Sequence, residues 1–194
     1  GDDGLAKCGE VWFNELRVVE FNNQGGEAAT ARLVTKLADL GTFTVSGNYQ
    51  SIGWGGIDKK LNDRNLNEIM LYDMQTSLEL GKFFPAKWGI TVPFFMQRGE
   101  QFIRPKYNPL NPDILLETTV KAAQNEQEKQ EILNAAEDYT ARRSFNFTNV
   151  RKNRMGGGKP QLWDIENFNF TFSFQEVFRR NQQIAASLQR TWRG

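Results

Sequence analysis

One glycine-rich segment has the composition of a phosphate-binding loop, Gly156-Gly157-Gly158-Lys159. A nucleotide-binding loop of this type also needs an earlier glycine and a Ser or Thr directly after the lysine, because the hydroxyl holds Mg²⁺. Asn153 and Pro160 occupy those two positions, and we expect no helix to follow. We therefore interpret the segment as a flexible hairpin loop.

Carboxylates form two groups with the types needed for acid–base chemistry: Asp63 with Glu68 and Asp73, and Asp164 with Glu166. General acid–base catalysis requires such groups at a fixed distance from the substrate. The spacing does not fix that distance, and both groups fall at expected loops or strand ends. The chain contains no histidine, which excludes a Ser/His or Cys/His dyad and a His-ligated metal. We expect a protein that is not an enzyme, with no catalytic residue, no cofactor and no metal site.

Charge and composition exclude further classes. The 24 Lys and Arg against 23 Asp and Glu leave a net charge of +1, so there is no overall electrostatic footprint for nucleic acid. Cys8 is the single cysteine and cannot form an internal disulfide. No apolar run approaches the ~20 residues of a membrane helix. The polar start, Gly1 to Gly4, does not read as a signal peptide, so we expect a cytoplasmic protein or an excised or mature segment.

Two-faced strands are the elements that would position any site. The clearest alternates the phenylalanines of 168–174 with Asn169, Thr171 and Ser173. Such a period of two is typical of a strand that buries one face in an apolar medium. Pro93 predicts a bulge or a locally free edge in one strand. The expected strands are 11–21, 29–37, 42–50, 72–80, 88–96, 144–150, 168–178 and 184–192, mostly joined as hairpins.

A long insertion interrupts the strands at 98–143. Its first part is punctuated by proline and asparagine, and a charged helix is expected at about 115–139. The apolar positions of that helix are too sparse for deep burial. We interpret it as a solvated helix that caps a loop, and as the best candidate for contact with a partner or cargo.

The apolar side of the strands faces either a protein core or a lipid bilayer. Strands of about ten residues match the ~9–11 that cross a bilayer at barrel tilt, whereas strands of soluble proteins are typically about five or six. Aromatic residues such as Tyr49, Trp88 and Trp192 lie near strand ends, as the girdles of a membrane barrel require. These features favour the bilayer. The alternative is a soluble β-sandwich binding module, with Trp54, Trp88 and Trp163 as stacking platforms for a glycan.

The bilayer interpretation assigns each strand residue to one of two environments. The expected lipid-facing residues are Phe43, Val45, Leu78, Leu80, Ile90, Val92, Phe94, Phe168, Phe170 and Phe172. The expected lumen-facing residues are Thr44, Ser46, Asn48, Gln75, Ser77, Glu79, Asn169, Thr171 and Ser173.

Six short strings carry a resemblance to a known family, in matching order and spacing: residues 11–17, 36–41, 78–85, 105–110, 145–151 and 163–168. On these strings the chain resembles the SprA/Sov family, the outer-membrane translocon of the type IX secretion system, which is associated with gliding motility. The resemblance runs from Val11 to Arg193. It implies a very large single-chain β-barrel in the cell outer membrane, with a water-filled pore through which folded cargo leaves the cell.

The resemblance also implies partners: secreted protein cargo, an outer-membrane shuttle or gate protein, a periplasmic plug protein, and membrane lipid. Family members are much longer than this chain, whose seven or eight expected strands cannot close such a pore. The expected fold is therefore all-β, an antiparallel meander of long hairpins forming one segment (1–194) of a large transmembrane β-barrel with one inserted helix.

Overall fold

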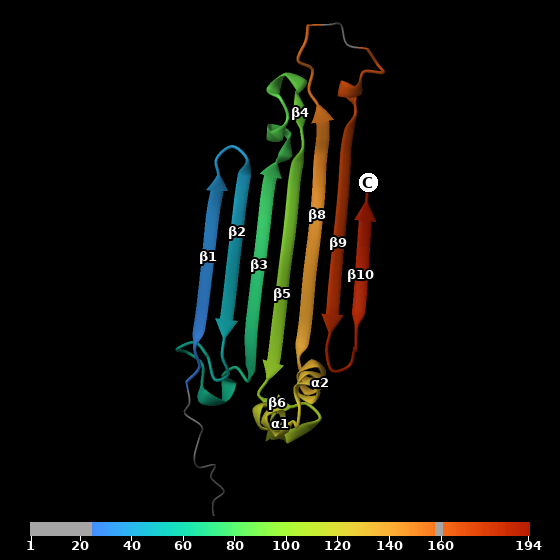
Figure 1. The fold of residues 1–194 in the computed structure, drawn as a ribbon. Helices are drawn as coiled ribbons and strands as arrows, with labels where there is room; N and C mark the ends of the chain where they lie inside the picture. The colour runs from blue at the N-terminus through green and yellow to red at the C-terminus, as the bar shows by residue number, and fades with distance from the viewer. Residues whose placement is uncertain (1–24, 158–160) are drawn as a thin grey trace, which may run out of the picture.

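A computed structural model describes residues 25–157 and 161–194. These residues form mainly one open antiparallel sheet in the strand order β1-β2-β3-β5-β8-β9-β10, with β4 paired to β8 (Figure 1). The strands of this sheet are β1 (Ala28–Leu37), β2 (Gly41–Gln50), β3 (Asn67–Glu79), β4 (Ile90–Thr91), β5 (Pro93–Pro105), β8 (Asp138–Lys152), β9 (Asn169–Arg180) and β10 (Ser187–Arg193). The predicted meander of hairpins is confirmed for these residues, whereas the strand expected at 11–21 lies outside them. Within the described residues the sheet does not close, so β1 and β10 are its edges there.

The connections lie at two ends of the sheet (Figure 1). We call one the turn end: it carries residues 38–40, the segment 80–92 with η2 (Leu80–Phe83) and η3 (Ala86–Trp88), and residues 153–157 and 161–168 with η4 (Ile165–Asn167). The other, the helix end, carries residues 51–66 with η1 (Leu61–Asp63), residues 106–137, and the turn 181–186. Long and short connections therefore occur at both ends.

The turn between β1 and β2 depends on one glycine. Gly41 has φ +154°, and a Cβ added to it would lie 1.9 Å from the carbonyl oxygen of Ser77 on β3. The Leu40 N–H donates to the Leu37 carbonyl at 2.9 Å, which closes the turn. A side chain at position 41 would therefore push β2 away from β3.

The strand expected at 88–96 is interrupted close to Pro93, as predicted. Residues 90–91 form β4, Val92 is outside any strand, and β5 begins at Pro93. The carboxylate of Glu79 holds this point together, because its Oε1 accepts from the Val92 N–H at 2.6 Å and from the Gly81 N–H at 3.1 Å. Sequence alternation had assigned Glu79 to a polar strand face, but its side chain instead completes the turn end.

The insertion differs from its prediction in two respects. Residues 98–105 belong to β5 and residues 138–143 to β8, so the insertion between strands is 106–137. Within it, the single helix expected at about 115–139 is wrong: α1 (Leu116–Ala122) and α2 (Glu126–Ala136) follow a small hairpin of β6 (Tyr107–Asn108) and β7 (Asn111–Leu115). Asn125 begins α2, since its Oδ1 accepts from the Glu128 N–H at 2.8 Å. Glu128 Oε2 in turn accepts from the Gln124 N–H at 2.8 Å, an arrangement close to a capping box.

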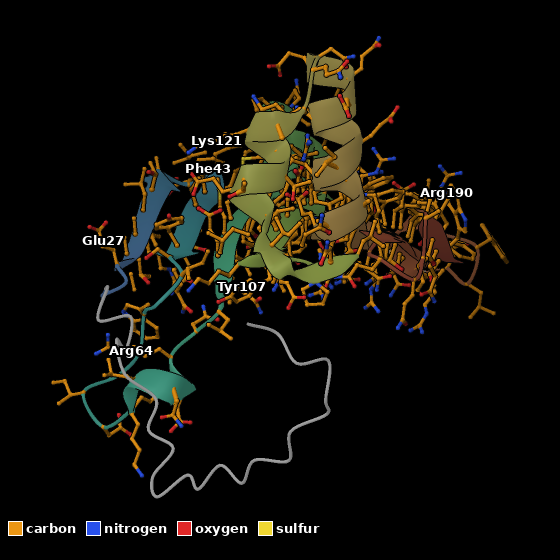
Figure 2. All side chains as sticks on the ribbon, turned by 90° about the horizontal axis from the view of Figure 1, so that it is seen from below. Glu27, Phe43, Arg64, Tyr107, Lys121 and Arg190 are labelled. Carbon is orange, nitrogen blue, oxygen red and sulfur yellow. The ribbon has the colours of Figure 1, made fainter. Side chains whose placement is uncertain are left out.

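The main sheet of the described residues is a single layer. Their buried apolar side chains are Leu116, Ala136 and Phe174. Figure 2 looks along the strands from the helix end, with the helices projecting to one side of the sheet and the segment that carries Arg64 to the other. A sandwich core needs a second sheet packed about 10 Å away, and the described residues supply none.

Candidate functional site

Cross-strand register places most of the aromatic residues of the strands on one side of the sheet. Residues paired in an antiparallel ladder lie on the same face, and the pairing Leu78–Phe94, Phe94–Phe147 and Phe147–Phe172 runs across four neighbouring strands. We call this side the aromatic face. It carries Phe43, Val45, Leu78, Phe94, Phe145, Phe147, Phe170, Phe172, Phe174 and Trp192.

The alternate residues form the opposite side, which we call the polar face. It carries Thr44, Ser46, Asn48, Gln75, Ser77, Asn169, Thr171 and Ser173. Hydrogen bonds run along it: Asp73 accepts from Gln75 Nε2 at 2.8 Å and from Gln97 Nε2 at 2.9 Å, and Asn48 Nδ2 donates to Thr30 Oγ1 at 2.9 Å. Eight of the nine residues predicted for the wet side thus share one face.

Aromatic rings contact one another across the aromatic face near the turn end. Phe174 lies between Phe145 and Trp192, with ring centroids 5.0 and 4.6 Å away, and Phe94 lies 5.0 Å from Phe147. Phe174 is buried by these neighbours, whereas Phe170 and Trp192 remain more than half exposed. Ring-to-ring contact therefore covers the sides of the rings and leaves an open apolar surface above them.

Sequence analysis missed a row of charges on this same face. Register aligns Arg98 of β5 with Arg143 of β8, then Glu176 of β9 and Arg190 of β10. Glu176 binds both Arg143 and Arg190, at 2.6 Å each, and Arg98 binds Glu100 at 2.9 Å. We call Arg98, Arg143 and Arg190 the arginine row. The row lies two residues beyond Phe174 along β9. It separates the turn-end rings from a second aromatic group on the same face, Phe102, Tyr139 and Phe178.

A second ionic cluster fastens the insertion to the helix end of the sheet. Glu137, directly after α2, is buried and accepts from Arg104 Nε at 2.6 Å and from Arg180 Nη2 at 3.1 Å. The Arg180 guanidinium also lies 5.3 Å from the centre of the Tyr139 ring. This cluster links α2 to β5 and β9 at once, which fixes the insertion relative to the strands.

Other contacts organise the connections. Arg154 binds both Asp164 and Glu166 across the segment between β8 and β9, with 2.5 Å to Glu166, and these carboxylates raise the pKa of its guanidinium. In α1, Lys121 donates to Glu117 at 2.5 Å and lowers the pKa of that carboxyl.

A groove of about 1150 Å³ lies at the helix end. It runs between the helices and residues 51–66, and it is lined in part by Tyr49, Leu66, Leu116 and Leu133.

The remaining predicted lipid-facing residues lie outside the regular strands of the aromatic face. Leu80 lies in η2, Ile90 in β4, Val92 at the break before β5, and Phe168 directly after η4. All four belong to the turn end.

The candidate catalytic groups separate in the structure. Glu68 and Asp73 lie on opposite faces of β3, since five positions separate them, while Asp164 and Glu166 share the cation Arg154. The glycine-rich segment lies partly outside the described residues. No group of His, Cys, Asp and Glu suited to a metal ion occurs in the described parts of the chain.

The tryptophans of the glycan alternative also lie apart. Trp88 and Trp163 are at the turn end, and Trp54 is at the helix end. The described residues therefore do not bring the three rings together as one stacking platform.

Comparison with known proteins identifies one family. A family model described as a motility related/secretion protein, SprA_N, matches residues 2–120, which include β1 to β7. A comparison with curated proteins finds no match. Neither α1 nor α2, nor any other helix of residues 25–157 and 161–194, is long and apolar enough to span a bilayer.

Proposed function

Because the chain belongs to the SprA family of motility-related and secretion proteins, we propose that it forms part of the wall of an outer-membrane channel that exports folded proteins. The family assignment suggests a membrane-associated role in secretion. The wall role adds that the sheet itself meets the bilayer, with lipid on the aromatic face and the water of a pore on the polar face. The role involves no catalysis.

The observation that carries this proposal is the open aromatic face. Rings such as Phe170 and Trp192 are exposed on a single layer of sheet, and each large apolar side chain left in water forgoes roughly 1.5–3 kcal/mol of burial. Hydrocarbon would cover this surface without a second protein layer. The polar face, with its serines, threonines and amides, suits a pore that conducts varied proteins without trapping them.

The uncharged stretch of the aromatic face, which we call the apolar belt, lies at a different height on different strands. This slant also supports the proposal. On β2 the aromatic face is uncharged from Phe43 to Tyr49, centred at Ser46, which register aligns with Val177 on β9. On β9 the uncharged residues of the same face run from Phe170 to Phe174, before Glu176, and their centre lies five residues nearer the turn end. Five residues are about 17 Å along a strand, and the four strand spacings between β2 and β9 are about 19 Å.

The belt therefore crosses the strands obliquely, inclined by about 40° from the perpendicular, within the 35–45° strand tilt of membrane barrels. A sheet in such a barrel keeps its apolar belt level with the bilayer only if the belt climbs from strand to strand in this way. A soluble sheet has no reason to shift its apolar residues along the strands in this way.

Site-directed spin labels on neighbouring residues of β9 test the proposal. Phe172→Cys and Ser173→Cys variants, each in a Cys8→Ser background, carry a nitroxide on opposite faces of one strand in lipid nanodiscs. We expect the label at position 172 to be relaxed by oxygen, which partitions into lipid, and the label at 173 by a water-soluble nickel complex. Equal accessibility of both labels to the nickel complex would exclude the wall role.

The insertion 106–137 extends this proposal to partners. It is long, rich in charge and anchored by Glu137, so it presents a fixed surface at one mouth of the pore. We assign it contact with cargo, with the shuttle or gate protein, or with the periplasmic plug. Replacing 107–136 by a short glycine–serine linker should leave outer-membrane assembly intact and impair secretion. Unchanged secretion would remove this role from the insertion.

A further inference from the structure

We propose that the arginine row binds the phosphate group of an anionic lipid at the edge of the bilayer. The inference rests on the wall role, since it places hydrocarbon against the aromatic rings on the turn-end side of the row. It assigns a lipid-binding function to Arg98 and Arg143 in particular, with Arg190 at the edge strand (Figure 2).

The outward charge of the row is positive. The side chains of Arg98, Arg143 and Arg190 are 60%, 63% and 52% exposed, whereas their partners Glu100 and Glu176 are 11% and 9% exposed. The carboxylates therefore lie beneath the guanidinium groups. Three cations over two anions leave a surplus of one positive charge, and an approaching molecule meets the cations first.

The register is unfavourable without a bound anion. Arg98 and Arg143 are direct cross-strand partners on β5 and β8, and like charges in that position repel. Each guanidinium has five N–H donors in a planar fork. Contacts within the described residues use Arg98 Nε and Nη2 and Arg143 Nη2. A phosphate between the two side chains would accept from the remaining donors and relieve the repulsion.

A hollow of about 370 Å³ adjoins the row on its helix-end side. Its wall includes Arg98 and Arg143 together with Ala141, Phe178 and Leu188, and the carboxylates of Glu100 and Glu176 also line it. The small Ala141 side chain makes the hollow possible, because its neighbours in register, Glu100 and Phe178, are large. The site thus combines a cationic rim with an apolar wall, the chemistry of an amphipathic headgroup region rather than of a free ion in water.

The position of the row fits the boundary of the belt. From Phe168 to the register position of the row at Glu176 is eight residues, about 27 Å along the strand and about 20 Å along the bilayer normal at barrel tilt, near the ~25 Å apolar height of such barrels. Phosphates lie at that boundary. On β2 and β3, where the belt extends further toward the helix end, Val45 and Met74 replace the arginines in the same register row.

Native mass spectrometry of the chain in maltoside micelles tests the inference. The probes are phosphatidylglycerol and a diacylglycerol with the same acyl chains but no phosphate. We expect phosphatidylglycerol to be retained in preference to diacylglycerol, and its affinity to fall about tenfold to a hundredfold in the Arg98→Gln/Arg143→Gln variant, since two charge-assisted contacts are lost. The matched control is Arg179→Gln, which removes an exposed arginine from the polar face of β9 and should leave the affinity unchanged.

Three results would overturn the inference: unchanged affinity in the double variant, an equal loss in Arg179→Gln, or full displacement of the lipid by millimolar inorganic phosphate, which would identify free phosphate as the ligand. Arg98→Lys/Arg143→Lys keeps both charge pairs but not the planar fork, so it decides the question if the glutamine variant does not fold. Its affinity should lie below that of the parent chain, and equality would count against the site.

The nitroxide at position 172 separates this inference from the wall role. If oxygen relaxes that label while the double variant retains lipid as the parent does, the phosphate site is wrong and the wall role stands. If the label is not in lipid, both fail.

Discussion

The ionic cluster at Glu137 gives the sharpest prediction on stability. The Glu137→Gln substitution keeps the size of the side chain and removes the charge that Arg104 and Arg180 share. Removing one member of a fully buried ion pair costs about 3–5 kcal/mol. Here the Glu137 side chain is 6% exposed, but Arg104 is 43% exposed and keeps Glu68 at 3.8 Å, while Arg180 is 24% exposed. Water can therefore solvate part of the orphaned charge, and we expect about 2 kcal/mol.

This loss should appear as local opening of the insertion rather than of the sheet. Because Glu137 joins the end of α2 to β5 and β9, a weaker junction releases the helices first. A change of about 2 kcal/mol corresponds to roughly thirtyfold faster amide exchange. Hydrogen exchange measured by mass spectrometry in nanodiscs should show that acceleration in 116–136 and unchanged protection in β3 and β8.

Glu131→Gln provides the control, because it removes an exposed carboxylate from α2, the helix that Glu137 follows. It should leave exchange within about twofold of the parent. If Glu137→Gln and Glu131→Gln exchange alike, the cluster does not anchor the insertion, and the surface that we assign to partner contact is not held in place.

Three further outcomes follow from single contacts. Arg154→Ala should accelerate proteolysis between β8 and β9 severalfold, since Arg154 binds Asp164 and Glu166; cleavage no faster than in Arg32→Ala, which removes an exposed arginine from β1, would show that the contacts do not restrain this segment. Lys121→Ala should raise the pKa of Glu117 toward its ordinary value in an NMR titration, because the Lys121 contact lowers it. The stabilisation of α1 by this pair is present above the ordinary carboxyl pKa and is lost as the pH falls through the lowered one, so identical titration curves would refute the pairing. Gly41→Ala should destabilise the β1–β2 hairpin by roughly 1–3 kcal/mol in denaturant unfolding, whereas Gly156→Ala, with nothing within 4 Å of its added Cβ, should not; equal midpoints would contradict the close approach to Ser77.

Alternation predicted the strands because apolar side chains of the aromatic face alternate with polar ones in most of them, as in Phe170-Thr171-Phe172-Ser173-Phe174. The alternating pattern of β9 permits one pairing register with its neighbours, and so does that of β2. A shift of the register by one residue would turn every phenylalanine of the strand to the other face. The same argument predicted the interruption near Pro93, because proline has no N–H for the ladder. Alternation does not show whether the aromatic face meets lipid or a protein core. That choice rests on the exposure of its side chains and on the slant of the apolar belt.

The charged parts of β5 and β8 were assigned to the insertion for an identifiable reason. Arg98, Glu100 and Arg104 occupy positions where alternation expects apolar residues, so alternation predicts an earlier end of the strand. The structure shows that they alternate correctly on one face of β5. Glu100 binds Arg98, and Glu176 binds Arg143, which aligns with Arg98 on β8. That compensation depends on register between segments far apart in sequence. The division of the insertion into two helices can be predicted more easily from sequence, because Asn125 followed by Glu128 is a helix-start signal.

The edges of the sheet place a further condition on the wall role. Outside their pairing with β2 and β9, the strands β1 and β10 have no partner among the described residues, and an unpaired backbone N–H or C=O in hydrocarbon costs several kcal/mol. If the aromatic face lies in lipid, both edges must pair with further strands. Those strands must continue the same slant, so the uncharged belt on the strand beside β10 should lie about one residue nearer the turn end than the belt on β10. A neighbouring strand with its belt level with that of β10, or shifted toward the helix end, would be incompatible with a tilted wall.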